Sequence, residues 1–220
     1  MKSLLDLLSA DERMELIRNT TERRFGNNEV VFHAGDLPDS LHIVSRGVFV
    51  AKVYSRGGHV LAINEFPPGA VFGELGVLAD DALRTASLFA PRKGGGSTRM
   101  LRRADFIEMR RRPIGQTIER FLLDELASRS REMTENLVEL LFTPAPRRIS
   151  RHLVRLGQPA FPDVGDGWHH ISQDDIAERT ATTRATVNRA LRSLEQRRIV
   201  ELGRGRIRVL DRDQLVLLAR

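Results

Sequence analysis

The sequence contains no cysteine, almost no lysine and no long apolar run. Without cysteine the chain cannot form a disulfide, use a thiolate as a nucleophile, or hold zinc or an iron–sulfur cluster through thiolates. No apolar run approaches the roughly 20 residues that a membrane-spanning helix needs. The first residues, MKSLLDLLSADERMELI, are too few and too acidic for a signal peptide. These absences predict a soluble, cytoplasmic protein that has no membrane partner.

Catalytic and metal-binding patterns are also missing. None of the six histidines lies at helical ligand spacing with a carboxylate, and the neighbours His169 and His170 would point apart on a strand. No nucleophile is paired with a base in the sequence, so the pattern offers no catalytic residue. We therefore expect no enzyme activity, no metal and no required cofactor.

The net charge of +6 is concentrated in one part of the 220 residues. Residues 1–145 carry 20 basic and 20 acidic side chains, whereas residues 146–220 carry 15 basic and 9 acidic ones. A neutral first part and a basic second part indicate a polyanionic partner for the second part, with a merely solvated basic surface as the alternative. Lys2, Lys52 and Lys93 are the only lysines, a bias that we attribute to a GC-rich genome.

The sequence pattern of the first half of the chain predicts many short strands. Ser9 and Glu12 form a capping-box pattern that predicts a helix from about 10 to 19. Between residues 29 and 103 short apolar runs alternate with turn residues, among them Gly57-Gly58 and Pro67-Pro68-Gly69. Strands this short and this regularly spaced are typical of a sandwich or a barrel-like β-roll.

After Pro113 the pattern becomes helical for about thirty residues. Apolar and small residues recur at spacings of three and four in a heptad seam: Leu123, Leu126, Ser130, Met133, Leu137 and Leu140. Such a seam packs against a second helix. Packing against its own domain is the alternative, but the length of the helix favours dimerisation. Thr143-Pro144-Ala145-Pro146 then breaks the helix and predicts a hinge.

The last third predicts a short helix over 147–156, a loop over 158–167, and then two compact helices and a hairpin over 171–220. Ser172 caps the first of the two helices, which has acidic residues in its first turn. Residues 180–183 form the turn, and Thr183 caps a second helix that runs to about Arg197. Val187, Leu191 and Leu194 form the core face of this second helix.

One stretch, Phe72-Gly73-Glu74-Leu75-Gly76-Val77-Leu78, has the composition of an anion site, and Arg84-Thr85-Ala86 follows it closely. A glycine that leads into a helical turn presents free backbone N–H groups to an anion. Arg84 can pair with a phosphate in a bidentate manner, and Glu74 can accept hydrogen bonds from sugar hydroxyls. One phosphate, one ribose and one pocket predict a cyclic mononucleotide.

These residues resemble the phosphate-binding cassette of cyclic-nucleotide-binding domains, and residues 5–209 as a whole resemble the Crp–Fnr (cAMP receptor protein) family of bacterial transcription regulators. The resemblance implies an α+β fold with three parts. They are a cyclic-nucleotide-binding β-roll, or jelly roll, over 1–112, a dimerisation helix over 113–143, and a winged helix-turn-helix that binds DNA over 144–220.

The resemblance also assigns ligand-binding roles. Gly73 and the amides of Glu74 and Leu75 line the phosphate, Arg84 neutralises it, and Glu74 binds the ribose 2′-hydroxyl. The predicted ligand-binding residues are Phe72, Gly73, Glu74, Leu75, Arg84, Thr85, Met133 and Thr134. cAMP-responsive members present two adjacent small hydroxyl residues where this chain has Met133-Thr134. Because methionine cannot donate a hydrogen bond to a base, cAMP is the first choice of effector and cGMP stays open.

The recognition helix resembles the family pattern Ser-Arg-Glu-Thr-Val-x-Arg, which here reads Thr183-Arg184-Ala185-Thr186-Val187-Asn188-Arg189. The family's guanine contacts carry over to Arg184 and Arg189. Ala185 replaces the glutamate that accepts from cytosine, so the operator should differ there. Ala181 stands where the turn glycine is usual. The predicted DNA-binding residues are Gln173, Thr182, Thr183, Arg184, Ala185, Thr186, Asn188, Arg189, Arg204 and Arg206, the last two on a wing around Gly203–Gly205.

The sequence therefore predicts a homodimeric regulator that binds double-stranded DNA at a palindromic operator and that a cyclic nucleotide controls. RNA polymerase is an expected partner. Two alternatives stay open: a constitutive DNA-binding protein with an unused nucleotide site, and a nucleotide-binding interaction module that does not bind DNA.

Overall fold

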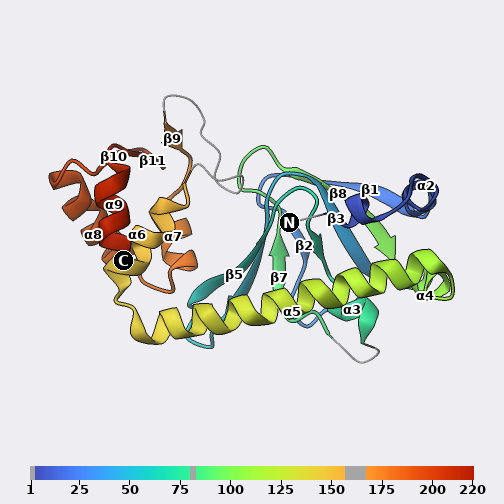
Figure 1. Cartoon of the computed structure of the whole chain (residues 1–220). Coiled ribbons are helices and arrows are strands. Elements are labelled where there is room, and N and C mark those ends of the chain that lie inside the picture. The colour runs from blue at the N-terminus through green and yellow to red at the C-terminus, as the bar shows by residue number, and fades with distance from the viewer. Residues whose placement is uncertain (1–2, 80–82, 157–166) are drawn as a thin grey trace. The chain divides into compact units, whose positions relative to one another are not determined.

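The computed structural model describes residues 3–79, 83–156 and 167–220. The chain divides into two compact units. The N-terminal unit consists of residues 1–53 and 63–131, and the C-terminal unit consists of residues 54–62 and 132–220. The long helix α5 belongs to both (Figure 1).

The N-terminal unit is built on two four-stranded antiparallel sheets (Figure 1). The first has the order β1-β8-β3-β6 and the second has the order β2-β7-β4-β5. The strands of the first sheet are β1 (Thr20–Phe25), β8 (Gly96–Arg102), β3 (Ser40–Arg46) and β6 (Val71–Phe72). Those of the second are β2 (Val30–Phe32), β7 (Ser87–Phe89), β4 (Phe49–Tyr54) and β5 (Val60–Phe66). The predicted β-roll is therefore confirmed.

Each face of the first sheet has its own core. One core holds phenylalanines from both sheets, and the ring centroid of Phe72 lies 5.5 Å from those of Phe49 and Phe66. In the other core Leu41, Ile43 and Leu101 pack with residues of the helices. These helices are α1 (Leu4–Leu7), α2 (Ala10–Arg18), α3 (Leu75–Leu78), α4 (Arg103–Met109) and the first half of α5. Ser9 caps α2 as predicted, whereas the pattern did not predict α1 and α4.

Helix α5 (Pro113–Phe142) agrees with the predicted helix of residues 113–143 and has two different apolar faces. One face is buried within the N-terminal unit and contains Ile114, Ile118, Phe121 and Leu122. The other contains the predicted heptad seam, where Leu123 is 54%, Met133 53% and Leu137 56% exposed. Val138, Leu141 and Phe142 are exposed as well. Packing against the helix's own unit therefore accounts for the first face and not for the seam.

The C-terminal unit is a small helical domain with a three-stranded sheet in the order β10-β11-β9. Its elements are α6 (Ala145–Val154), β9 (Trp168–His169), α7 (Gln173–Arg179), α8 (Arg184–Gln196), β10 (Val200–Gly203), β11 (Arg206–Val209) and α9 (Arg212–Ala219). Leu153, Ile176, Leu191, Ile207 and Leu215 are among its buried core residues.

Two predictions for this unit need correction. The closing segment has a third helix, α9, and the hairpin β10–β11 is extended by β9 to a sheet of three strands. The first helix begins at Ala145 instead of Arg147, because Pro144 takes the N-cap position and Pro146 is tolerated in the first turn. Residues 158–166 of the predicted loop lie outside the described residues. Among the described helices none combines the length and the apolarity that crossing a membrane requires.

Candidate functional site

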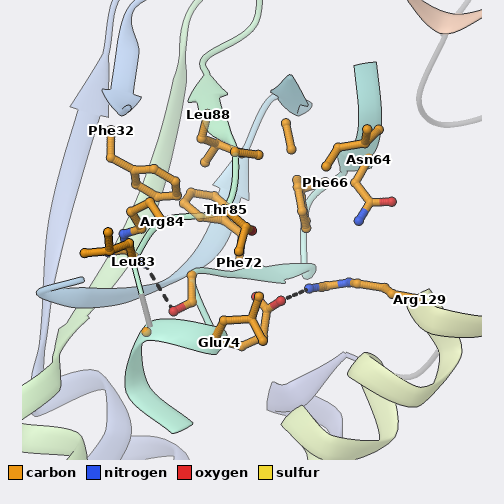
Figure 2. A pocket seen from close by; sticks show the side chains of 16 residues that line it. Phe32, Asn64, Phe66, Phe72, Glu74, Leu83, Arg84, Thr85, Leu88 and Arg129 are labelled. Carbon is orange, nitrogen blue, oxygen red and sulfur yellow. Dashed lines mark hydrogen bonds and ion pairs between the residues drawn. The ribbon is translucent and has the colours of Figure 1, made fainter. Parts of the chain in front are cut away.

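A pocket with a cavity of about 80 Å³ lies beside β6 and α3 in the N-terminal unit (Figure 2). Six of the predicted ligand-binding residues line it: Phe72, Gly73, Glu74, Leu75, Arg84 and Thr85. Most of the wall is apolar. The polar side chains of the lining are Asn64, Glu74, Arg84, Thr85 and Arg129.

The backbone at Gly73 can be formed only by glycine without strain. Its φ is +85°, which other residues rarely adopt. A Cβ atom there would lie 2.6 Å from Nη1 of Arg84 and 2.8 Å from the carbonyl oxygen of Ser40. The glycine therefore makes the turn from β6 into α3 and leaves room for the guanidinium of Arg84. The sequence pattern predicted a glycine that leads into a helical turn at this position, and the structure has this turn.

Arg84 is a buried cation held by the protein itself. Its side chain is 3% exposed, Nη1 donates to the carbonyl oxygen of Gly73 at 3.2 Å, and Nη2 donates to that of Ser40 at 2.8 Å. Nη2 also lies 3.2 Å from the Asp39 carboxylate. The guanidinium carbon is 4.1 Å from the centroid of the Phe32 ring. Burial lowers the pKa of Arg84 and Asp39 partly offsets this effect, but a guanidinium stays protonated in either case.

One donor of Arg84 is not used. Its Nε is buried and has no hydrogen-bond partner among the described residues. Buried donors of native proteins are almost always paired, with protein, water or a ligand. The pocket therefore offers a buried positive charge with an unused N–H group.

Glu74 takes part in a second buried charge cluster (Figure 2). One of its carboxylate oxygens lies 2.8 Å from Nη1 of Arg129 on α5, and a carboxylate oxygen of Glu125 lies 3.5 Å from Nη2. The Arg129 guanidinium also donates to the carbonyl oxygen of Val71 and lies 4.9 Å from the centroid of the Phe66 ring. Sequence reasoning missed Arg129, although Glu125 and Arg129 have the i,i+4 spacing of a helical ion pair.

Met133 and Thr134 are not part of the pocket lining in this chain. Both side chains are exposed on α5, one turn beyond Arg129. Their predicted contact with a ligand stays a prediction.

A buried polar network adjoins Arg84. The Oγ of Ser40 lies 3.1 Å from Nε2 of His42, whose Nδ1 lies 3.0 Å from Oγ1 of Thr98. The His42 ring stacks on Phe72 with a centroid distance of 4.9 Å. Burial, reinforced by the positive charge of Arg84, lowers the pKa of His42 to about 3. His42 is therefore neutral near pH 7, and its two ring nitrogens are satisfied by hydroxyl groups.

The C-terminal unit contains the predicted helix-turn-helix. Oγ of Ser172 accepts a hydrogen bond from the amide of Asp175 at the start of α7, and Oγ1 of Thr183 accepts one from the amide of Thr186 at the start of α8. Ala181 in the turn has a φ of +45°, so the position where glycine is usual does adopt the left-handed conformation. Thr183 is thus confirmed as a cap.

At the start of α8 the side chains that face solvent are either basic or small. Arg184, Ala185 and Arg189 are exposed, whereas Val187 and Leu191 are buried. Arg184 lies 3.6 Å from the carboxylate of Asp174 in an exposed ion pair, which is a weak interaction that a stronger partner can replace.

Polar residues on α7 and α8 fix the position of this face. Nδ2 of Asn188 donates to Oε1 of Gln173 at 3.2 Å, and a guanidinium nitrogen of Arg189 lies 3.5 Å from Oγ1 of Thr186. Thr182 and Thr186 are partly exposed and Thr183 is exposed near the start of α8. These predicted DNA-binding residues therefore lie together around one helix end.

Two arginines mark the wing. Arg204 and Arg206 are exposed at the tight turn between β10 and β11, where Gly205 has a φ of +67°. The guanidinium of Arg206 lies 4.3 Å from the centroid of the Trp168 ring on β9. The third strand therefore supports one wing arginine through its aromatic side chain.

A single arginine joins the end of α5 to the turn of the helix-turn-helix. Arg148 donates to the carbonyl oxygen of Thr143 at 2.6 Å, to that of Thr180 at 3.0 Å and to that of Ala181 at 3.2 Å. The predicted hinge at Thr143–Pro146 is thus bridged by a residue of α6. Sequence reasoning missed this role, because isolated arginines carry no signal for their carbonyl partners.

Models of two known domain families match two separate parts of the chain. A model of the cyclic nucleotide-binding domain matches residues 22–112, and a model of the Crp-like helix-turn-helix domain matches residues 147–218. Neither match includes helix α5.

Two relatives match this chain over most of its length. The chain is 26% identical over 205 residues to a CRP-like cAMP-activated global transcriptional regulator of Mycobacterium tuberculosis, which covers 89% of this chain and 87% of that protein. It is 25% identical over 191 residues to the cAMP-activated global transcriptional regulator Vfr of Pseudomonas aeruginosa, covering 86% and 88%.

A solved structure shows the same fold. The c-di-GMP-responsive global regulator CLP of Xanthomonas campestris superposes with a TM-score of 0.80 at 18% identity, covering 91% of this chain and 99% of that one.

Proposed function

The chain belongs to the Crp–Fnr family of transcription regulators, and we propose that it is a homodimer whose DNA binding is controlled by a cyclic nucleotide in the pocket of Figure 2. Members of this family are regulators and not enzymes. The chain combines a cyclic-nucleotide-binding domain with a Crp-like helix-turn-helix domain. Because bacterial transcription takes place in the cytoplasm, we propose that the protein acts there. We also propose RNA polymerase as a partner.

The observation that carries the ligand proposal is the unused Nε–H of Arg84. A buried cation with an unpaired donor lies in the same pocket as Glu74, which can accept from a hydroxyl group. A cyclic phosphate supplies both the negative charge and the acceptor, and hydrogen bonds between charged groups are the strong ones. A ribose hydroxyl supplies the donor for Glu74.

cAMP is the first choice of effector. Two whole-length relatives are named as cAMP-activated regulators, and their names support the same ligand here. cGMP stays an alternative because Met133 cannot hydrogen-bond to a base. The structural likeness to a c-di-GMP-responsive regulator makes that dinucleotide a third ligand to test.

We propose that α5 forms the dimer contact. In a single chain a long apolar stripe of α5 is exposed to water, and it includes Leu123, Met133, Leu137 and Phe142. Large exposed apolar patches mark interaction sites, and a heptad seam fits an identical helix. Leu137→Asp should therefore convert a dimer into a monomer in sedimentation experiments, while circular dichroism stays that of a folded protein.

For DNA, we propose that the start of α8 enters the major groove. Arg184 and Arg189 would read guanine edges, the threonines around Thr183 would bind phosphates, and Arg204 and Arg206 would bind the flanking backbone. In a dimer the two α8 helices must face half-sites about 34 Å apart. The ligand acts because it binds one arrangement of the dimer, in which the two helices meet this spacing, with a different affinity from the arrangement in which they do not.

Calorimetric titration of the purified protein with cAMP, cGMP and c-di-GMP tests the sensor. We expect binding of cAMP and a loss of roughly 10- to 100-fold in affinity for Arg84→Gln, because a hydrogen bond to a charged group contributes about 1.5–3 kcal/mol. Thermal unfolding checks that the variant is folded. If none of the three ligands binds, the alternative of a constitutive DNA-binding protein with an unused site is favoured.

Mobility shifts on genomic fragments, with and without the ligand, test the DNA half. Arg189→Ala should cost about 1–3 kcal/mol on the specific operator and little on random DNA, whereas Arg204→Ala should weaken both and lower the salt slope by about one unit. Binding of nucleotide without any binding of DNA would favour the alternative of an interaction module.

A further inference from the structure

Asn64 is the polar residue of the pocket that the proposed contacts leave without a role. All four of the other polar residues line the pocket. In the proposed function Arg84 and its neighbour Thr85 take the phosphate, and Glu74, which Arg129 holds, takes the ribose. Asn64 lies on β5 and lines the same pocket. Within the described part of the chain its side-chain amide makes no hydrogen bond. An amide in a largely apolar pocket, without a protein partner, suits a ligand.

The position of Asn64 assigns it to the base. Figure 2 shows its side chain next to Phe66, across the pocket from Arg84 and Leu83. With the phosphate at Arg84 and the ribose at Glu74, the remaining part of the pocket, which Ile63, Asn64 and Phe66 line, is left for the base. Phe66 offers an aromatic surface there, and Asn64 offers the polar group at its edge.

The chemistry of the amide selects one purine. An asparagine side chain has a carbonyl oxygen that accepts and an NH₂ group that donates. On one edge adenine presents an amino donor at N6 beside the acceptor N7, and asparagine matches this pair in a bidentate manner. On the same edge guanine and hypoxanthine present two acceptors, O6 and N7. The carbonyl oxygen of the amide then has no donor to pair with, in whichever orientation the amide lies, and an unpaired polar group is costly.

We propose that Asn64 is the specificity residue for adenine, an inference that rests on the proposed function of the pocket. Asn64 supplies the base recognition that Met133 cannot supply. The protein is then selective for cAMP over cGMP because of a residue in the β-roll and independently of α5.

Titration with cAMP, cGMP and cyclic IMP tests the proposal. Cyclic IMP has the size of cAMP but carries O6 in place of the amino group, so it isolates the contact to N6. The wild-type protein should bind cAMP about tenfold more tightly than cyclic IMP or cGMP. Asn64→Leu, which has nearly the same volume, should lower the cAMP affinity about tenfold and that of the other two by less than threefold.

Two further variants separate the explanations. Asn64→Ala removes the amide without adding an apolar group and should abolish the preference in the same way. Thr85→Val, at the phosphate end of the same pocket, should weaken all three nucleotides equally and leave their order unchanged. Circular dichroism verifies the fold of each variant.

A preference for cAMP that persists in both Asn64 variants overturns the proposal while the pocket's proposed function stands. A wild-type preference for cGMP or cyclic IMP overturns it as well. If the wild-type protein binds no cyclic nucleotide, the proposed function of the pocket fails, and the role of Asn64 fails with it.

Discussion

Acidification from pH 7 to pH 5 is expected to destabilise the N-terminal unit through His42. This residue is 3% exposed, and burial together with the charge of Arg84 lowers its pKa to about 3. An unfolded histidine has a pKa near 6.5. Between these two values the unfolded chain binds a proton that the folded chain does not, so stability falls as the pH falls.

The size of the effect follows from the two pKa values. The contribution of His42 is fully present above pH 6.5 and is lost progressively toward pH 3. Between pH 7 and pH 5 the free energy of unfolding should drop by about 2 kcal/mol on account of this group.

Urea unfolding followed by circular dichroism at pH 7 and pH 5 measures the loss. His42→Gln removes the titration but keeps a donor and an acceptor for Ser40 and Thr98, so its loss should be smaller than that of the wild type by about 2 kcal/mol. Burial also lowers the pKa of His152 to about 3. Since His152 is present in both proteins, it contributes equally to the loss of stability in the wild type and in His42→Gln. His59→Gln, at an exposed position, is the control. An equal loss in wild type and His42→Gln would refute the reasoning.

Three more substitutions have defined outcomes. Gly73→Ala forces an alanine to a φ of +85° and against Arg84 and Ser40, so it should lower both thermal stability, by about 1–3 kcal/mol, and nucleotide affinity; unchanged calorimetric titrations would contradict this. Ala181→Gly relieves a φ of +45° and should stabilise the C-terminal unit by about 0.5–1 kcal/mol in urea unfolding followed by Trp168 fluorescence, whereas a destabilised variant would contradict the strain. Arg148→Gln removes the donor to Thr143 and to the turn. It should leave nucleotide affinity within about twofold but reduce the effect of the nucleotide on DNA affinity in mobility shifts, and full retention of that effect would exclude a role in coupling.

The sequence was sufficient for the parts of the fold that depend on local chemistry. The capping serines Ser9 and Ser172, the heptad seam of α5 and the glycine turn before α3 all encode their structure within a few residues. The elements that were missed do not. Helix α9 has eight residues, too few for a clear period, and β9 has two residues that become a strand only by pairing with β11.

The same distinction holds for the site. Gly73, Glu74 and Arg84 were predicted because a phosphate site needs these residue types close together in the chain. Arg129 and Asn64 reach the pocket from α5 and β5, which the sequence separates by about sixty residues, so only the fold brings them together. The buried state of His42 has the same origin, since its partner Thr98 lies on the neighbouring strand β8.

Helix α5 carries an arginine-dependent contact near its middle, and a second one follows its C-terminal end. Just past its midpoint Arg129 holds the carboxylate of Glu74, so the position of α5 affects the position of the proposed ribose acceptor. Thermodynamic coupling is reciprocal. A ribose bound to Glu74 therefore favours the position of α5 that keeps this ion pair. After its C-terminal end the carbonyl of Thr143 is tied by Arg148 to the helix-turn-helix turn. Substitution of Arg129 should thus alter both nucleotide affinity and coupling, whereas substitution of Arg148 should alter coupling alone.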